Sequence, residues 1–243
     1  AGGSLRLAED NIDEIVKQMS LREKAMLLVG CESLVSKDSL TVYVPGAAGY
    51  TKSFPQYGIP STVMADGPVG VRIFPIKVDG KRHYCTCFPS STLLASTWDT
   101  QLVETQAGAM GKEAAVYDVD VILTPGINIM RNPLCGRNFE YFSEDPVLSG
   151  LMGAAMVNGV QSRGIGTSLK HFVANNQQVN KLNNDSRIPV KALREIYLKG
   201  FEICLQHSNP WTVMSSYNKI GGILTQSNAE LLRTVLREEW GYD

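Results

Sequence analysis

Val119-Asp120-Val121-Ile122-Leu123-Thr124-Pro125-Gly126 is the stretch that indicates the fold most directly. A short apolar run ends here in a Thr-Pro-Gly stop, and an amphipathic helical stretch at roughly residues 99 to 117 precedes it. The same order of apolar run, polar or Gly-Pro stop and helix recurs from Ile59 onward. Parallel neighbours in a sheet need a crossover between them, so strands that alternate with helices predict a parallel α/β sheet.

Four runs fit this pattern and supply the expected strands: Ser61 to Ala65, Val119 to Thr124, Thr167 to Leu169 and Val213 to Ser216. A fifth strand is expected around Ser91 to Ala95. The expected helices lie at roughly 99 to 117, 146 to 162, 190 to 207 and 227 to 240. Before them, Ser20-Leu21-Arg22-Glu23 has the form of a capping box between two short helices. Residues 31 to 60 are rich in Gly and Pro and are expected to be mostly loop.

Polar groups follow every expected strand, as Asp66-Gly67-Pro68, Thr124-Pro125-Gly126, Lys170-His171 and Tyr217-Asn218. Function at the carboxyl ends of successive strands is typical of the (β/α) barrel, although an open doubly wound sheet shares part of this habit. No glycine-rich dinucleotide fingerprint follows a strand, which favours the barrel. Four or five strands are too few to close an eight-stranded barrel. We therefore predict an incomplete TIM-like barrel, completed by downstream sequence or a second chain. We expect residues 1–30 to form a helical segment that packs on the barrel, and residues 31–243 to form the first part of the barrel itself.

The composition of the chain excludes several classes of partner and cofactor. The 243 residues are 44% apolar and 19% charged, with a net charge of -1, so we expect neither nucleic acid nor an anionic membrane as partner. No apolar run reaches the roughly 18 to 20 residues of a membrane span, and Ala1 to Leu7 lack the order of a signal peptide. The sequence leaves open whether the protein is cytoplasmic or exported, and whether it forms a homodimer. Five cysteines without metal-ligand spacing predict no metal and no cofactor.

Two charged segments carry the candidate chemistry. Arg137 offers a fixed fork of donors that suits carboxylates or vicinal hydroxyls, and a pair with Glu140 is an equally good interpretation. Lys170 and His171 are adjacent, and adjacent strand residues normally point to opposite faces. Both can reach one pocket only where the backbone is irregular, so we expect distorted or cis geometry within residues 169 to 173. His171 alone would more often be a satisfied core imidazole.

Four further residues have a structural and a functional interpretation. Asp66 ends the first strand, where its carboxylate could accept hydrogen bonds from neighbouring sugar hydroxyls or stabilise its own turn. Met214 and Tyr217, on the last expected strand, are more often core than site when taken alone. Asp145 before Pro146 reads as a helix N-cap rather than a catalytic group.

Taken together, the motifs resemble the amino-terminal barrel of glycoside hydrolase family 3. They are Asp66-Gly67-Pro68, Gly136-Arg137-Asn138-Phe139-Glu140, Ser143-Glu144-Asp145-Pro146, Lys170-His171-Phe172 with Asn175-Asn176-Gln177, Ala192 to Leu198, Ser216-Tyr217-Asn218 and Leu236-Arg237-x-Glu239-Trp240-Gly241. The resemblance implies that the glycone subsite is lined by Asp66, Arg137, Lys170, His171 and Tyr217, with Met214 also near the sugar. Residues 173 to 178 resemble the β-glucosidases, although Gln178 stands where many relatives carry Glu.

The same resemblance implies a retaining β-glucosidase that acts on terminal non-reducing β-D-glucosyl residues of a glucoside or oligosaccharide. Its nucleophile is expected beyond Asp243 and its general acid in a later α/β sandwich domain, so the chain alone should be inactive and needs the remainder of the enzyme. Two other functions stay open: a barrel aldolase that uses Lys170 as a Schiff-base amine, and a sugar-binding chain without catalysis.

Overall fold

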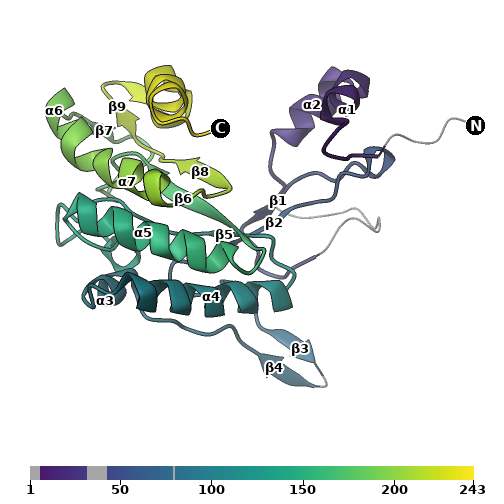
Figure 1. Cartoon of the computed structure of the whole chain (residues 1–243), viewed down its shortest axis with the longest axis horizontal. Helices are drawn as coiled ribbons and strands as arrows, with labels where there is room; N and C mark the ends of the chain where they lie inside the picture. Colours follow the sequence, from purple (N-terminus) through teal and green to yellow (C-terminus); the bar gives the residue numbers. More distant parts are fainter. Residues whose placement is uncertain (1–5, 32–42, 79) are drawn as a thin grey trace, which may run out of the picture.

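A computed structural model describes residues 6–31, 43–78 and 80–243 of the chain. Its centre is a five-stranded sheet of order β1-β2-β5-β6-β8 (Figure 1). The strands are β1 (Gly49–Tyr50), β2 (Val63–Asp66), β5 (Val121–Leu123), β6 (Gly166–Phe172) and β8 (Thr212–Ser215). The last four run parallel, and β1 pairs with β2 antiparallel. All four strands expected from the apolar runs are therefore present.

The central strands are buried on both faces, as strands of parallel sheets are. Every residue of β5 and of β6 is buried, including the polar Thr167, Ser168, Lys170 and His171 of β6. A buried polar side chain costs free energy unless it has a partner. The carboxyl end of β6 is therefore the place in the sheet where polar contacts matter most.

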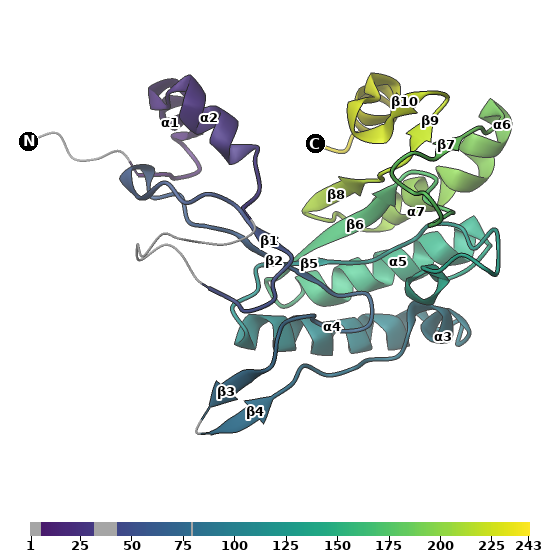
Figure 2. The same cartoon turned by 180° about the vertical axis from the view of Figure 1, so that it is seen from behind.

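Three helices lie side by side along one face of the sheet: α4 (Thr100–Val116), α5 (Pro146–Gln161) and α7 (Lys199–His207) (Figures 1 and 2). Asp145 caps α5 by accepting a hydrogen bond from the backbone N–H of Val147 at 2.8 Å, which confirms its predicted role as N-cap. Gly159 brings α5 close to α4, because a Cβ there would lie 2.3 Å from the carbonyl oxygen of Glu104. Strands that alternate with these crossover helices give the architecture of an incomplete (β/α) barrel.

The strand expected at Ser91 to Ala95 is wrong, because this segment is the helix α3 (Ser91–Ala95). The Ser90 hydroxyl accepts a hydrogen bond from the backbone N–H of Leu93 and caps it. Ser91, Leu94 and Ala95 are its buried residues, which is the helical spacing of i, i+3 and i+4 rather than strand alternation.

At the amino end, α1 (Ile12–Gln18) and α2 (Leu21–Leu27) pack on residues 54 to 59 and stand apart from the helices on the sheet (Figure 1). The capping box predicted at Ser20 and Glu23 is confirmed. The loop-rich stretch predicted for 31 to 60 lies partly outside the described residues. The division into a helical segment 1–30 and a barrel part 31–243 stays a prediction.

The remaining elements are short and were not expected from the sequence. They are the hairpin β3 (Ile76–Val78) and β4 (Lys81–His83), the small sheet of β7 (Asp185–Ser186), β9 (Lys219–Ile220) and β10 (Ile223–Leu224), and the 3-10 helices at Pro55–Tyr57, Asn138–Glu140 and Thr225–Ser227.

The last two expected helices are present, each with π-helical segments. Helix α6 (Val190–Ala192) continues through the π-helical Leu193–Tyr197 toward α7, and the final helix, Glu230–Glu239, is π-helical. No helix in the described ranges is both long and apolar enough to cross a bilayer.

Candidate functional site

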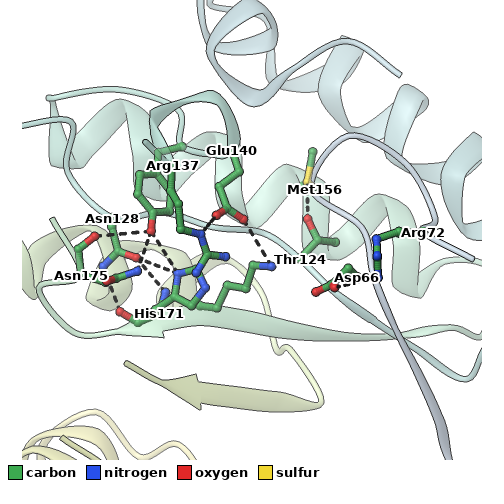
Figure 3. A network of polar contacts seen from close by, with 11 residues as sticks. Asp66, Arg72, Thr124, Asn128, Arg137, Glu140, Met156, His171 and Asn175 are labelled. Atoms are coloured by element: carbon green, nitrogen blue, oxygen red, sulfur yellow. Dashed lines mark hydrogen bonds and ion pairs between the residues drawn. The ribbon is translucent and has the colours of Figure 1, made fainter. Parts of the chain in front are cut away.

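The loop that follows β5 is bound to the carboxyl end of β6, and this contact assembles the site. Ile127 donates its backbone N–H to the carbonyl oxygen of Lys170, and Lys170 donates its own to that of Pro125, each at 2.9 Å. Farther along, the same loop forms the 3-10 helix Asn138–Glu140, which begins one residue after Arg137. Two charged segments far apart in the sequence are thereby placed next to each other (Figure 3).

Glu140 is the buried anion at the centre of the charged cluster. Its Oε1 accepts a short hydrogen bond from Nε of Arg137, and its Oε2 lies 3.4 Å from Nζ of Lys170. Glu140 is 1% exposed and Lys170 2%, so water screens this pair little. The predicted pair of Arg137 with Glu140 is present, and Lys170 joins it as the third member.

His171 lies in a separate set of neutral contacts beside this cluster (Figure 3). Its Nδ1 is 3.1 Å from Oδ1 of Asn128 and 3.2 Å from the hydroxyl of Tyr141. Tyr141 in turn accepts a hydrogen bond from Nδ2 of Asn175 at 2.9 Å. All four residues are buried, so the imidazole is held on one side by polar groups that have few alternative partners.

The irregular backbone predicted for residues 169 to 173 is present. The Lys170–His171 and Phe172–Val173 peptide bonds are both cis, and the pairing of β6 with β8 shifts register between Lys170 and Phe172. Lys170 contacts Glu140 while His171 contacts Asn128, and both of these partners belong to the loop after β5. Adjacent residues of β6 thus face the same loop.

Asp66 ends β2 and borders the same charged cluster. Its carboxylate is 4.0 Å from Nη1 of Arg72 and is 42% exposed, unlike the buried Glu140. The charge of Asp66 acts on both cations: it opposes the burial that lowers the pKa of Lys170, and it adds to the hydrogen bond and charge of Glu140 that raise the pKa of Arg137. The structure therefore brings Asp66, Arg137, Lys170 and His171 together, and Asp66 is the more accessible of the two carboxylates, Asp66 and Glu140 (Figure 3).

Two candidate residues, one on the last strand β8 and one two residues after it, lie at the border of this group. Met214 is the register partner of Lys170 in the β6–β8 pair, which places it next to the cluster. Tyr217 is 53% exposed and has no hydrogen bond to the cluster within the described part of the chain. Its ring lies 5.2 Å from Nζ of Lys181, whose charge acts on His171. Tyr217 is thus exposed at the border, not core.

Burial and charge shift the pKa values in the cluster. Burial lowers the pKa of Lys170, and the neighbouring Glu140 opposes this shift without cancelling it. Burial, followed by the charges of Arg137, Lys170 and Lys181, lowers the pKa of His171 well below its usual value, so its imidazole is neutral at pH 7. For Arg137, burial acts to lower the pKa, but the hydrogen bond and charge of Glu140 outweigh it and raise it.

A large cavity lies next to this group rather than within it. It has a volume of about 1040 Å³ and lies between residues 131 to 136 and the segments 176 to 179 and 184 to 188. Asp66, Lys170 and His171 do not line it. Among these residues, no group of three or more His, Cys, Asp or Glu side chains could hold a metal ion.

Asn128, Tyr141 and the bridging role of Glu140 were missed by the sequence prediction. Asn128 lies four residues after the end of the apolar run at Thr124, in the same strand-end position as the other candidates. That position is the signal that could have identified it. Tyr141 directly follows the Gly-Arg-Asn-Phe-Glu motif and gave no separate signal.

Comparison with known proteins identifies relatives over nearly the whole chain. Residues 56–243 match the model of the glycosyl hydrolase family 3 N terminal domain. The chain is 43% identical to thermostable beta-glucosidase B of Acetivibrio thermocellus over 96% of its length, and 44% identical to an exo-alpha-(1->6)-L-arabinopyranosidase of Bifidobacterium longum over 94%. It spans 29% of the length of each of these two relatives.

A solved structure is also similar to this chain over nearly its whole length. Beta-glucosidase 3B of Thermotoga neapolitana in complex with alpha-D-glucose superposes with a TM-score of 0.89 at 51% identity. The match covers 96% of this chain and 33% of that one. The prediction of an incomplete TIM-like barrel is thereby confirmed.

Proposed function

Because the chain belongs to glycosyl hydrolase family 3, we propose that it supplies the sugar-binding part of a retaining β-glucosidase. The reaction would transfer a terminal β-D-glucosyl unit to water: the bond from the anomeric carbon to the leaving oxygen breaks, and a water oxygen bonds to that carbon. In the first of two displacements, a carboxylate in the rest of the enzyme would bond to the anomeric carbon as the leaving oxygen departs with a proton from the second carboxyl group. Water would then displace that carboxylate and return a proton to the second group, so that two inversions leave the anomeric configuration unchanged. The chain would provide contacts to the sugar, and the rest of the enzyme the two catalytic carboxyl groups.

One observation carries this proposal: charged groups from separate segments gather at the carboxyl ends of β2 and β6. Asp66 presents a partly exposed acceptor, while Arg137 and Lys170 present donors. Vicinal hydroxyls of a pyranose need acceptors and donors at short spacing. A neutral sugar also suits a cluster in which the two cations, Arg137 and Lys170, are balanced by Glu140 together with Asp66.

The proposed glycone subsite consists of Asp66, Arg137, Lys170, His171, Met214 and Tyr217. Contacts to the hydroxyls would strengthen as the ring flattens toward an oxocarbenium-like transition state, and would thereby lower the barrier. Lys170 fits this role better than that of a Schiff-base amine, because its ammonium is paired with Glu140. The aldolase alternative loses its support.

A panel of nitrophenyl glycosides tests the proposal on the complete enzyme. We expect the highest kcat/KM on β-D-glucoside, with the β-anomer of glucose as the first product seen by proton NMR. An α-first product would reject the retaining mechanism. The panel should include the β-D-xyloside and the α-L-arabinopyranoside, since one relative is named for arabinopyranoside. Higher kcat/KM on either would reject glucose as the preferred glycone.

A further inference from the structure

We propose that Asn128 fixes His171 as the tautomer protonated on Nδ1, so that Nε2 accepts a hydrogen bond from a hydroxyl of the substrate. Asn128 is then a positioning residue that acts through His171. The identity of the ligand as a sugar rests on the proposed function, whereas the tautomer follows from the geometry alone.

Three contacts between Asn128 and His171 define the orientation of the amide. Nδ2 of Asn128 donates to the carbonyl oxygen of His171 at 2.9 Å, and Oδ1 accepts from the backbone N–H of His171 at 2.9 Å. The third contact joins the same Oδ1 to Nδ1 of the imidazole at 3.1 Å. A flipped amide would lose both backbone bonds, so the atom that faces Nδ1 is the carbonyl oxygen.

An amide oxygen can only accept, and this decides the tautomer. With a proton on Nδ1, the imidazole donates to Oδ1 of Asn128. Without it, two lone pairs would face each other at 3.1 Å in a site that excludes water.

The hydroxyl of Tyr141 is compatible with this arrangement. It accepts from Nδ2 of Asn175 and can donate to the carbonyl oxygen of Asn175 at 3.4 Å. It therefore has a partner for its proton without needing Nδ1 of His171 as an acceptor.

The groups around the imidazole keep it neutral. Arg137 from the loop after β5, Lys170 from β6 and Lys181 from the loop after β6 are all positive, and Tyr141 is uncharged because burial raises its pKa. No carboxylate is among the groups that shift the pKa of His171. Nε2 therefore carries a lone pair, on the ring edge that faces away from Asn128.

A neutral acceptor beside an ammonium makes a matched pair for hydroxyl groups. Lys170 can only donate, and Nε2 of His171 can then only accept. A sugar hydroxyl does both, so adjacent hydroxyls can satisfy the two residues at once. A protonated His171 would instead present a second donor and lose this match.

The variant Asn128→Asp tests the inference in the complete enzyme. A carboxylate at Nδ1 stabilises the imidazolium and should raise the pKa of His171 by about one to three units. We expect the acid limb of the kcat/KM profile to move up by at least about one pH unit. Asn158→Asp is the matched control, because Asn158 also donates to a histidine carbonyl, that of His207, but lies on α5 away from the cluster.

A purely structural role of Asn128 would lower kcat/KM by the same factor at every pH, and that result would overturn the inference.

NMR of the ¹⁵N-histidine-labelled wild-type enzyme gives a test that needs no folded variant at Asn128. The His171 signals, assigned with His171→Asn, should show Nδ1 protonated and Nε2 unprotonated at pH 7.5. Signals that show Nε2 protonated and Nδ1 unprotonated would also overturn the inference. An enzyme that cleaves no glycoside would reject the proposed function, while the NMR result would still decide the tautomer.

Discussion

The charge of Glu140 can be removed with little change in shape by Glu140→Gln, and the structure predicts a large loss of stability. Both carboxylate oxygens are occupied, one by Arg137 and the other by Lys170 at 3.4 Å. Breaking a buried ion pair from one side leaves an uncompensated buried charge and costs about 3 to 5 kcal/mol. We expect a loss of this size in the free energy of unfolding at pH 7, measured by urea denaturation of the complete enzyme.

A surface pair provides the matched control. Lys199 and Glu202 form an ion pair at 3.0 Å, but their side chains are 42% and 28% exposed, so Glu202→Gln should cost no more than about 0.5 kcal/mol. Adding Lys170→Met to Glu140→Gln removes the stranded ammonium and should recover at least about 1 kcal/mol. Equal losses for Glu140→Gln and Glu202→Gln would refute the claim that burial makes the central pair important.

Three further predictions concern the substrate, pH and packing. Asp66→Ala should lower kcat/KM at least about a hundredfold, a loss of about 2.7 kcal/mol in transition-state binding, and near-wild-type turnover would remove Asp66 from the subsite. Because the pKa of His171 is lowered in the folded protein, the unfolded chain binds more protons than the folded one below the ordinary histidine pKa of about 6.5. The free energy of unfolding, measured with urea, should therefore fall as the pH drops below that value, and should fall less steeply in His171→Asn. Gly67→Ala places a Cβ 2.0 Å from Cγ2 of Ile122 and should cost about 1 to 3 kcal/mol. Gly30→Ala should be neutral in the same denaturation assay, because among the described residues, its chain neighbours aside, the nearest atom to the new Cβ is the carbonyl oxygen of Tyr50 at 3.8 Å.

Local patterns in the sequence were sufficient for most of the secondary structure. The runs around Val63, Val121 and Val213 form strands because apolar residues in short runs bounded by turn residues are suited to a buried parallel sheet. Ser91 to Ala95 was the exception, since an apolar run of five residues fits a strand or a helix. The capping interaction of Ser90 and the packing of Leu94 on the core decided for the helix.

Residue types in the sequence were likewise sufficient to nominate Asp66, Arg137, Lys170 and His171, because charged groups at strand ends are costly unless they have partners or a ligand. Their partners could not be predicted in this way. Glu140 was expected to serve Arg137 alone, and Asn128 was not singled out at all. Both become decisive only when the loop after β5 is bound to the end of β6.

The sequence by itself thus determined which segments become strands and helices and which ionisable groups lie where strands end, because these depend on neighbours a few residues away. Only the tertiary structure decided that one carboxylate contacts two cations, that His171 is neutral, and that an amide oxygen faces its Nδ1. The pairing of Lys170 and the tautomer of His171 depend on burial and on contacts between groups that are 30 to 43 residues apart in the chain, and no local pattern encodes these contacts.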